Sequence, residues 1–187
     1  PIPSLQSIDH EEKVIYLGTF SKSIAPSLRI SYMVLPLHLL KKYQESCSFY
    51  STTVSKIQQE VLREFIRGGY FGRHLNKMRG IYKKKHDFLV GELKKKNWVQ
   101  NIAGDNAGLH VLVQVNTTLT EEEICKKAAE CGIRLMGIRE HYIHTPPEGR
   151  PVLLLGYGKP DEQEIQKGLE VLESIITGRN SNNCKKP

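Results

Sequence analysis

Residues 15–36 read IYLGTFSKSIAPSLRISYMVLP, and this stretch decides the fold. It carries most of two apolar runs, residues 14–17 and 28–35, and each run has the β-branched and aromatic composition of a buried strand. Gly18 ends the first run, and Pro36 ends the second at a point where proline can open a helix. The sequence therefore predicts two core strands joined by a short connection that carries Lys22.

The residues around Lys22 suit a nucleophilic amine next to a phosphate. A lysine forms a Schiff base when its amine is held near an aldehyde in a partly desolvated site. Hydroxyl groups, here those of Thr19 and Ser21, and a guanidinium such as that of Arg29 are groups that hold a phosphate. Arg29 falls within the second apolar run, where an unpaired charge is costly, so we expect it to meet an anion. The alternative is that Lys22 is an ordinary loop lysine and that Arg29 pairs with a carboxylate of the protein.

The segment 15–36 closely resembles the pyridoxal 5'-phosphate (PLP) lysine segment of fold type I aminotransferases. It looks most like the branch found in MocR/GabR-type transcription regulators of the GntR family. Two other segments are similar to that branch: FIRGGY at residues 65–70, followed by RHLNKMR at 73–79, and LLLGY at 153–157 before an acidic helix start. The resemblance extends from residue 1 to about residue 178.

This resemblance implies an α/β fold, namely the C-terminal part of a PLP-dependent transferase of fold type I. Residues 1–75 are then the end of the large PLP-binding domain, and residues 76–178 are the small C-terminal α/β domain with the long interdomain helix. Residues 179–187 are expected to form a disordered tail. The family also implies a homodimer.

The resemblance also assigns roles to the residues near Lys22. Lys22 is implied to hold PLP as an internal aldimine, Arg29 to bind the cofactor phosphate, and Thr19 and Ser21 to donate hydroxyl hydrogen bonds. The remaining cofactor contacts of the family are an aspartate, a stacking aromatic residue and a phosphate-binding loop. These are expected upstream of Pro1, so the chain alone is expected to bind PLP poorly.

The ligand-binding arginine is harder to assign. Many relatives carry an arginine for the ligand carboxylate in the last strand of the small domain, and Leu154 stands at the corresponding position here. Arg139 and Arg150 remain as candidates, and we favour Arg139 because it follows a predicted core strand at residues 133–138. A surface arginine without a ligand is the alternative reading of Arg139.

Two functions share this site. In the first, an amino acid or amine effector displaces Lys22 to form an external aldimine, and a domain movement then changes DNA binding by a separate N-terminal winged-helix domain. In the second, the chain is the C-terminal part of a genuine class I/II aminotransferase, and Lys22 also acts as the general base between substrate Cα and PLP C4'. A third idea is that basic residues of the long helix contact DNA directly.

The net charge of +7 does not by itself require a nucleic acid partner, because lysine clusters at residues 83–85 and 94–96 fit one solvated helix face. The sequence has no apolar run long enough for a membrane span and no signal peptide pattern, which predicts a cytoplasmic protein. The four cysteines are expected to be free thiols. No metal site is expected, since the pair His141 and His144 lacks a nearby cluster of cysteines or carboxylates.

The remaining patterns predict helices and strands in alternation. Gly156 and Gly158 resemble part of a nucleotide fingerprint, but the third glycine is missing and Pro160 intervenes. The predicted helices are residues 36–46, 53–66, 71–95, a helix that opens with a capping box at 120–123 and one that opens at 161; the predicted strands are 108–115, 133–138 and 151–157.

Overall fold

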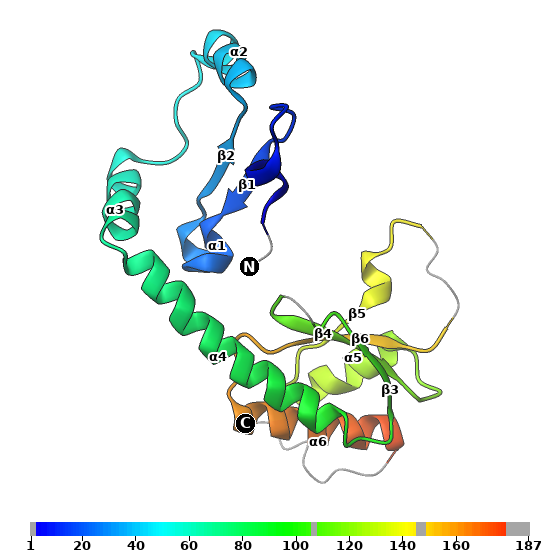
Figure 1. Ribbon diagram of the computed structural model, residues 1–187. Coiled ribbons are helices and arrows are strands. Elements are labelled where there is room, and N and C mark those ends of the chain that lie inside the picture. The colour runs from blue at the N-terminus through cyan, green and yellow to red at the C-terminus, as the bar shows by residue number, and fades with distance from the viewer. Residues whose placement is uncertain (1–2, 106–107, 145–148, 179–187) are drawn as a thin grey trace. The chain divides into compact units, whose positions relative to one another are not determined.

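The computed structural model of the protein describes residues 3–105, 108–144 and 149–178. The chain divides into two compact units, residues 1–78 and 79–187, and the division falls within one long helix, α4 (Tyr70–Leu93) (Figure 1). The assignment of residues 1–75 and 76–178 to two domains of the family fold stays a prediction, and the expected tail at 179–187 lies outside the described residues.

The first unit is built around an antiparallel pair of strands. Strand β1 (Tyr16–Thr19) pairs with β2 (Ser31–Val34), and Thr19 lies opposite Ser31. The strands are followed by two helices that match the predicted ones, and Ser55 caps the second by accepting a hydrogen bond from the Gln58 backbone amide at 3.2 Å. The other elements of this unit are η1 (Leu5–Ile8), α1 (Phe20–Ser23), η2 (Pro26–Leu28), α2 (Leu37–Cys47) and α3 (Lys56–Arg67).

The structure corrects the prediction for the two strands. The second strand begins at Ser31 rather than at Leu28, because Pro26 opens a turn of 3-10 helix and Arg29 adopts a left-handed backbone with φ 50°. Both strands are also largely exposed rather than buried. A two-stranded sheet becomes buried only when other elements pack against its faces. Within the described residues of this unit, Ile30 is the only buried hydrophobic residue, so little of either face is covered.

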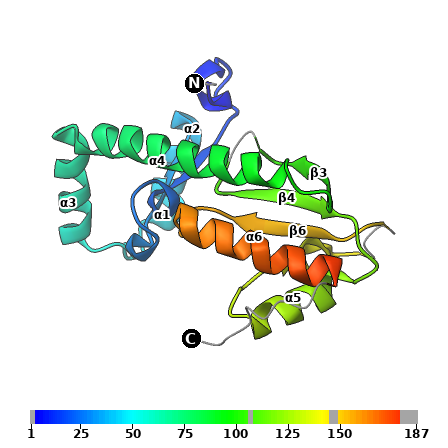
Figure 2. The ribbon, with the colours of Figure 1, turned by 90° about the horizontal axis from the view of Figure 1, so that it is seen from below.

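The second unit contains an antiparallel sheet with strand order β3-β4-β6-β5. Helices α4, α5 and α6 cover one face of this sheet (Figure 2). Residues in β4 alternate between the two faces, so that Val111, Val113 and Val115 are fully buried beneath the helices. The elements are β3 (Val99–Ala103), β4 (His110–Val115), α5 (Glu121–Glu130), β5 (Met136–Gly137), η3 (Ile138–His141), β6 (Val152–Gly156) and α6 (Glu162–Thr177).

The helices α5 and α6 of this unit begin where the sequence predicts, whereas the strands β3 and β5 differ from the prediction. Both α5 and α6 open with a complete capping box, formed by Thr120 with Glu123 and by Asp161 with Glu164. Strand β3 was not predicted, because its residues do not alternate in polarity. The strand expected at 133–138 is reduced to two residues, because Gly132 turns the chain with φ 78° and the next residues run clear of the sheet.

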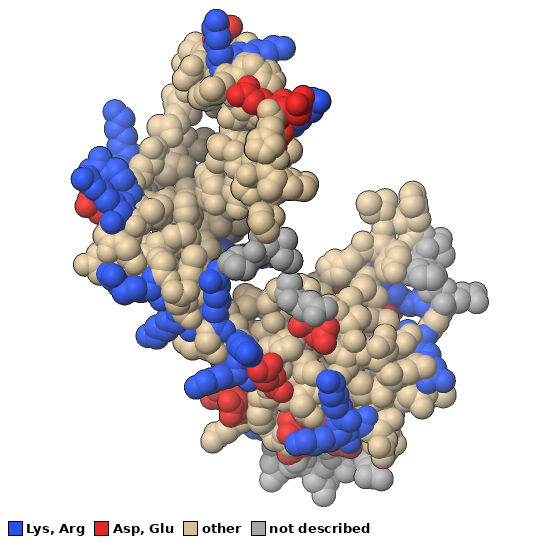
Figure 3. Space-filling view, in the orientation of Figure 1, with Lys and Arg blue, Asp and Glu red and all other residues tan. Residues whose placement is uncertain are grey.

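The lysine clusters are only partly a solvated helix face. Helix α4 ends at Leu93, so Lys94–Lys96 lie in the following turn and not on the predicted helix. Lys96 forms an ion pair with Glu173 at 2.7 Å, and Lys85 donates to the carbonyl oxygens of Gly158 and Lys159. Figure 3 shows basic and acidic side chains interspersed over the visible surface. Lys85 and Lys96 therefore bind groups of the protein itself, which leaves fewer lysines for the direct DNA contact considered above.

Three other expectations concern cysteines, metals and membranes. Cys47 and Cys125 are free thiols, but Cys131 is disulfide-bonded, so the prediction of free thiols is wrong for Cys131. Burial, followed by the negative charge of Glu140, raises the pKa of the Cys125 thiol above its usual value. Among the described residues, no group of three histidine, cysteine or acidic side chains could hold a metal ion. Across the same residues, every helix is too short or too polar to cross a membrane.

Candidate functional site

The connection between β1 and β2 is closed at its base by hydrogen bonds. The backbone amide of Phe20 donates to the Ile30 carbonyl oxygen at 2.9 Å, and the Thr19 hydroxyl donates to the same oxygen at 3.3 Å. Residues 19 and 30 are thus held side by side although they are eleven positions apart in the sequence. Because the chain between them is short, the structure brings Lys22 and Arg29 to the same end of the strand pair.

Lys22 and Arg29 are exposed at this end. Lys22 lies in the single turn of α1, and Arg29 is the residue that ends η2. A left-handed backbone is unfavourable for an arginine, and such strain concentrates at functional sites. Within the described residues neither side chain forms an ion pair, which disagrees with the reading that Arg29 pairs with a carboxylate of the protein. Both side chains are thus exposed to solvent and outside the ion pairs of the described residues.

Aromatic packing fixes the turn that carries Lys22. The Tyr32 ring lies across Gly18, and a Cβ atom at Gly18 would come within 2.2 Å of that ring. The same ring contacts Phe20, the first residue of α1, with centroids 5.0 Å apart. Partial burial, together with the neighbouring Tyr16, raises the pKa of the Tyr32 hydroxyl above its usual value. Gly18 is therefore needed for close approach, and the sequence signal for this was its position directly after an apolar run.

The two hydroxyl groups differ in their freedom to bind a ligand. The Thr19 oxygen already accepts from the Ser21 backbone amide at 3.2 Å and caps α1, while its proton points to the Ile30 carbonyl. The Ser21 hydroxyl makes no hydrogen bond with the described residues. Ser21 is thus the better donor to a phosphate, and Thr19 is better placed to hold the turn. An amine, a guanidinium and a hydroxyl at one end of a hairpin fit the aldehyde and phosphate of PLP.

Arg139 belongs to the second unit and is held there by Glu121. The Glu121 side chain is 6% exposed, and its two oxygens accept backbone hydrogen bonds from Arg139 and from Val152, each at 2.9 Å. The Arg139 Nε atom lies 4.0 Å from the same carboxylate. The Arg139 side chain is 45% exposed, so it remains reachable from solvent. Glu121 therefore joins the start of α5 to η3 and to β6 and fixes the backbone from which Arg139 projects.

Gly137 makes room for this carboxylate. A Cβ atom at Gly137 would lie 2.3 Å from the Glu121 Oε2 atom, so a larger residue would force Glu121 aside. Sequence reasoning missed Glu121, because it is one of three consecutive glutamates in a helix N-terminus and has no distinguishing pattern. Its burial is decided by the fold.

The other residues considered for ligand binding are placed differently. Leu154 lies on β6 opposite Leu112 of β4 and Met136 of β5, so this row of the sheet is apolar and carries no guanidinium. Arg150 donates to the Asn116 side-chain oxygen at 2.7 Å. Arg139 is thus the candidate whose backbone position the fold fixes most strongly.

A family model gives the first comparison with known proteins. The model described as aminotransferase class I and II matches residues 2–165. The chain is also 40% identical, over 175 residues, to the HTH-type transcriptional regulator YdeL of Bacillus subtilis. That match takes in 93% of this chain but 37% of YdeL, so the chain spans little more than a third of this relative's length.

Solved structures give the same fold. The multiple substrate aminotransferase from Thermococcus profundus matches 95% of this chain and 44% of its own, with a TM-score of 0.80 and 23% identity. The α-aminoadipate aminotransferase LysN from Thermus thermophilus, complexed with N-(5'-phosphopyridoxyl)-L-leucine, matches 95% of this chain and 46% of its own, with a TM-score of 0.78 and 24% identity. The predicted fold class is thereby confirmed. With the lysine-bearing hairpin and the antiparallel sheet unit in place, the chain belongs to the aminotransferase class I and II family.

Proposed function

We propose that this chain is the lysine-bearing part of a PLP-dependent, aminotransferase-like effector-binding domain in a cytoplasmic transcription regulator. The observation that carries the proposal is the common placement of Lys22 and Arg29 at one end of the β1–β2 pair, with neither in an ion pair among the described residues. The likeness to YdeL supports the regulator, and the family supports the cofactor. DNA binding is assigned to a separate winged-helix domain, and the active form to a homodimer.

Each residue of the hairpin has a defined part in this proposal. PLP, when bound, supplies an aldehyde that reacts with amines and withdraws electrons from the bound group. The Lys22 amine would hold the aldehyde, and an amino ligand would take its place. Arg29 and Ser21 would bind the phosphate, Arg29 through its guanidinium and Ser21 through a hydroxyl hydrogen bond. Thr19 holds the turn through its bond to Ile30.

The test of the cofactor site is the visible absorbance of lysine-bound PLP in the full-length protein. We expect Lys22→Ala to abolish that absorbance, and Lys41→Ala, which changes an exposed lysine of α2, to leave it intact. Arg29→Ala should keep the absorbance but weaken PLP affinity about tenfold or more, because a charge-assisted bidentate contact is lost. Unchanged absorbance in Lys22→Ala would refute the assignment.

Arg139 is proposed to bind the carboxylate of the ligand. Its support is an exposed guanidinium on a backbone fixed by Glu121. We expect Arg139→Ala to weaken the spectral response to an amino acid but not to the amine that lacks its carboxylate, while Arg150→Ala weakens neither. If Arg139→Ala weakens the responses to the amino acid and to the amine equally, Arg139 supports the structure and does not bind the carboxylate.

The second candidate function is a genuine aminotransferase, in which Lys22 also moves a proton as general base. Its specific support is the fold likeness to the Thermococcus profundus enzyme. Adding an amino donor and a 2-oxo acid acceptor to the full-length protein separates the two functions. A regulator gives one spectral change without sustained product, whereas an enzyme consumes donor and acceptor over many turnovers.

A further inference from the structure

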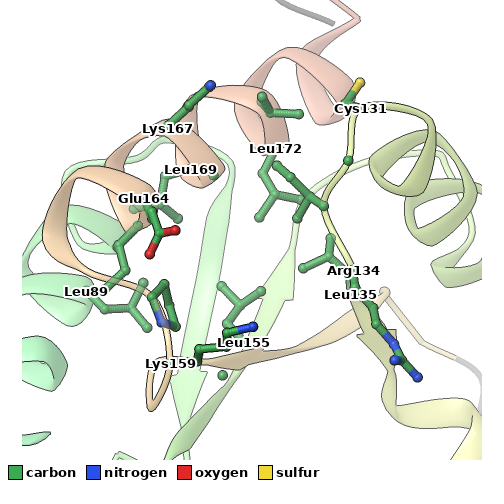
Figure 4. Close-up of a pocket in the computed structure, with 17 residues that line it drawn as sticks. Leu89, Cys131, Arg134, Leu135, Leu155, Lys159, Glu164, Lys167, Leu169 and Leu172 are labelled. Carbon is green, nitrogen blue, oxygen red and sulfur yellow. The ribbon is translucent and has the colours of Figure 1, made fainter. Parts of the chain in front are cut away.

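The second unit contains a cavity of about 640 Å³ whose lining residues all belong to that unit. It lies between α6, the segment that follows α5, and the end of β6 (Figure 4). This volume is within the range of small-molecule sites in proteins. The cavity plays no part in the chemistry proposed for Lys22.

The cavity lies where the chain after α5 runs outside the sheet before it reaches β5. Gly132 turns the chain with a left-handed backbone, and only Met136 and Gly137 then pair with β6. Residues 132–135 therefore run beside α6 as a separate wall, and a space stays open between that wall, α6 and Leu155. The strand predicted at 133–138 would have closed this space.

The inner surface of the cavity is apolar. Four leucines from three elements form it: Leu89 of α4, Leu155 of β6, and Leu169 and Leu172 of α6. Each is at most 6% exposed, so the core holds these leucines rigidly and they give the cavity a narrow apolar floor, to which the half-buried Ile133, Leu135 and Pro160 add apolar area. Leu135 faces α6 from the opposite wall in Figure 4. The floor of the cavity therefore favours an apolar group over a polar one.

The charged groups at the rim are mainly positive. Arg134, Lys159 and Lys167 line the cavity, and none of them forms an ion pair with any residue the structure describes. In Figure 4 the Lys159 side chain points toward the cavity, whereas the ends of Arg134 and Lys167 point outward. Lys159 is thus placed to contact a ligand, and the other two add positive potential around the mouth.

Among the described residues of the lining, Glu164 is the one acidic side chain, and it already takes part in the N-terminal cap of α6. One of its oxygens accepts the Asp161 backbone amide at 2.8 Å as part of the capping box of α6. Its negative charge disfavours a ligand with a second anionic group near it. A ligand with one negative charge at the Lys159 end and an apolar remainder fits this arrangement.

We infer that this cavity binds a small organic monocarboxylate with an apolar tail, with the carboxylate at Lys159 and the tail on the leucines. The site is independent of the amine chemistry proposed for Lys22, because a carboxylate without an amino group cannot react with an aldehyde in that way. Binding at this site is predicted to survive Lys22→Ala, so the two proposals succeed or fail separately.

Calorimetric titration of the full-length protein with 4-methylpentanoate and with 4-methylpentan-1-ol tests the inference. The two probes share the same tail and differ in charge. We expect the acid to bind at least about tenfold more tightly than the alcohol, and Lys159→Glu to remove that difference. Lys94→Glu, a charge reversal at an exposed lysine outside the cavity, should leave the affinity unchanged.

Filling the cavity gives a second, independent measurement. Leu172→Trp and Leu135→Trp are expected to abolish binding of the acid, and the second change lies at a half-buried position where misfolding is less of a concern. Circular dichroism checks that each variant is folded. Equal affinity for acid and alcohol, equal losses in Lys159→Glu and Lys94→Glu, or full binding by a folded Leu135→Trp variant would each overturn the inference.

Discussion

At the scale of single residues, Glu121 is the side chain whose removal we expect to disturb the second unit most. Its two oxygens accept the backbone amides of Arg139 and Val152 in a buried place, so Glu121→Ala leaves two donors without a partner. The expected loss is about 2–4 kcal/mol in the free energy of unfolding, and Glu121→Gln, which keeps one acceptor, should lose less. Urea unfolding measures both.

Glu122→Ala is the matched control, because the neighbouring glutamate is exposed. Its expected effect on unfolding is within about 0.5 kcal/mol. If Glu121→Ala and Glu122→Ala unfold at the same urea concentration, the carboxylate does not hold the η3 backbone as described. Gly137→Ala should resemble Glu121→Ala in stability, since its new Cβ atom would displace that carboxylate.

At the scale of elements, the longer helices and the strands β4 and β6 lie close to their predicted residues, whereas β2 and β5 do not. A helix is specified locally, by a cap such as Thr120 or Asp161 and by apolar residues at helical spacing. A strand exists only through its partner, which can lie far away in the sequence. The segment 133–138 has the composition of a strand, but Gly132 sets its direction, and only two residues reach β6.

At the scale of the whole molecule, the two units differ in how much apolar surface they bury. Among the described residues, the first unit has one buried hydrophobic residue, Ile30, and all the others lie in the second unit. We therefore expect amides of β4 and β6 to exchange hydrogen far more slowly than those of β1 and β2 in the chain of 187 residues. Mass spectrometry of deuterated peptides measures this.

The first unit also bears exposed apolar side chains such as Leu17, at 71%, and Leu37, at 71%. Slow exchange in β1 and β2 would contradict the expectation and would mean that this surface is covered in solution. Repeating the measurement at two protein concentrations identifies coverage by a second copy, because only that kind of protection rises with concentration.

The sequence by itself determined the family and the longer helices, and it singled out Lys22 as the candidate lysine. The segment around Lys22 is a contiguous pattern, so Lys22, Arg29, Thr19 and Ser21 can be recognised as a group from the sequence alone. Helix starts were predictable for the same reason, since caps and periodicity are local.

Only the tertiary structure decided which of these side chains form hydrogen bonds or ion pairs with other described residues of the protein. It showed that Thr19 is engaged with Ile30, that Arg29 sits on a left-handed turn and not in a strand, and that Glu121 is buried among three similar glutamates. It also showed that only Met136 and Gly137 of the predicted strand 133–138 pair with β6, and that residues 133–135 line a cavity. These features depend on contacts between residues that are distant in the sequence, and a local sequence pattern cannot predict such contacts.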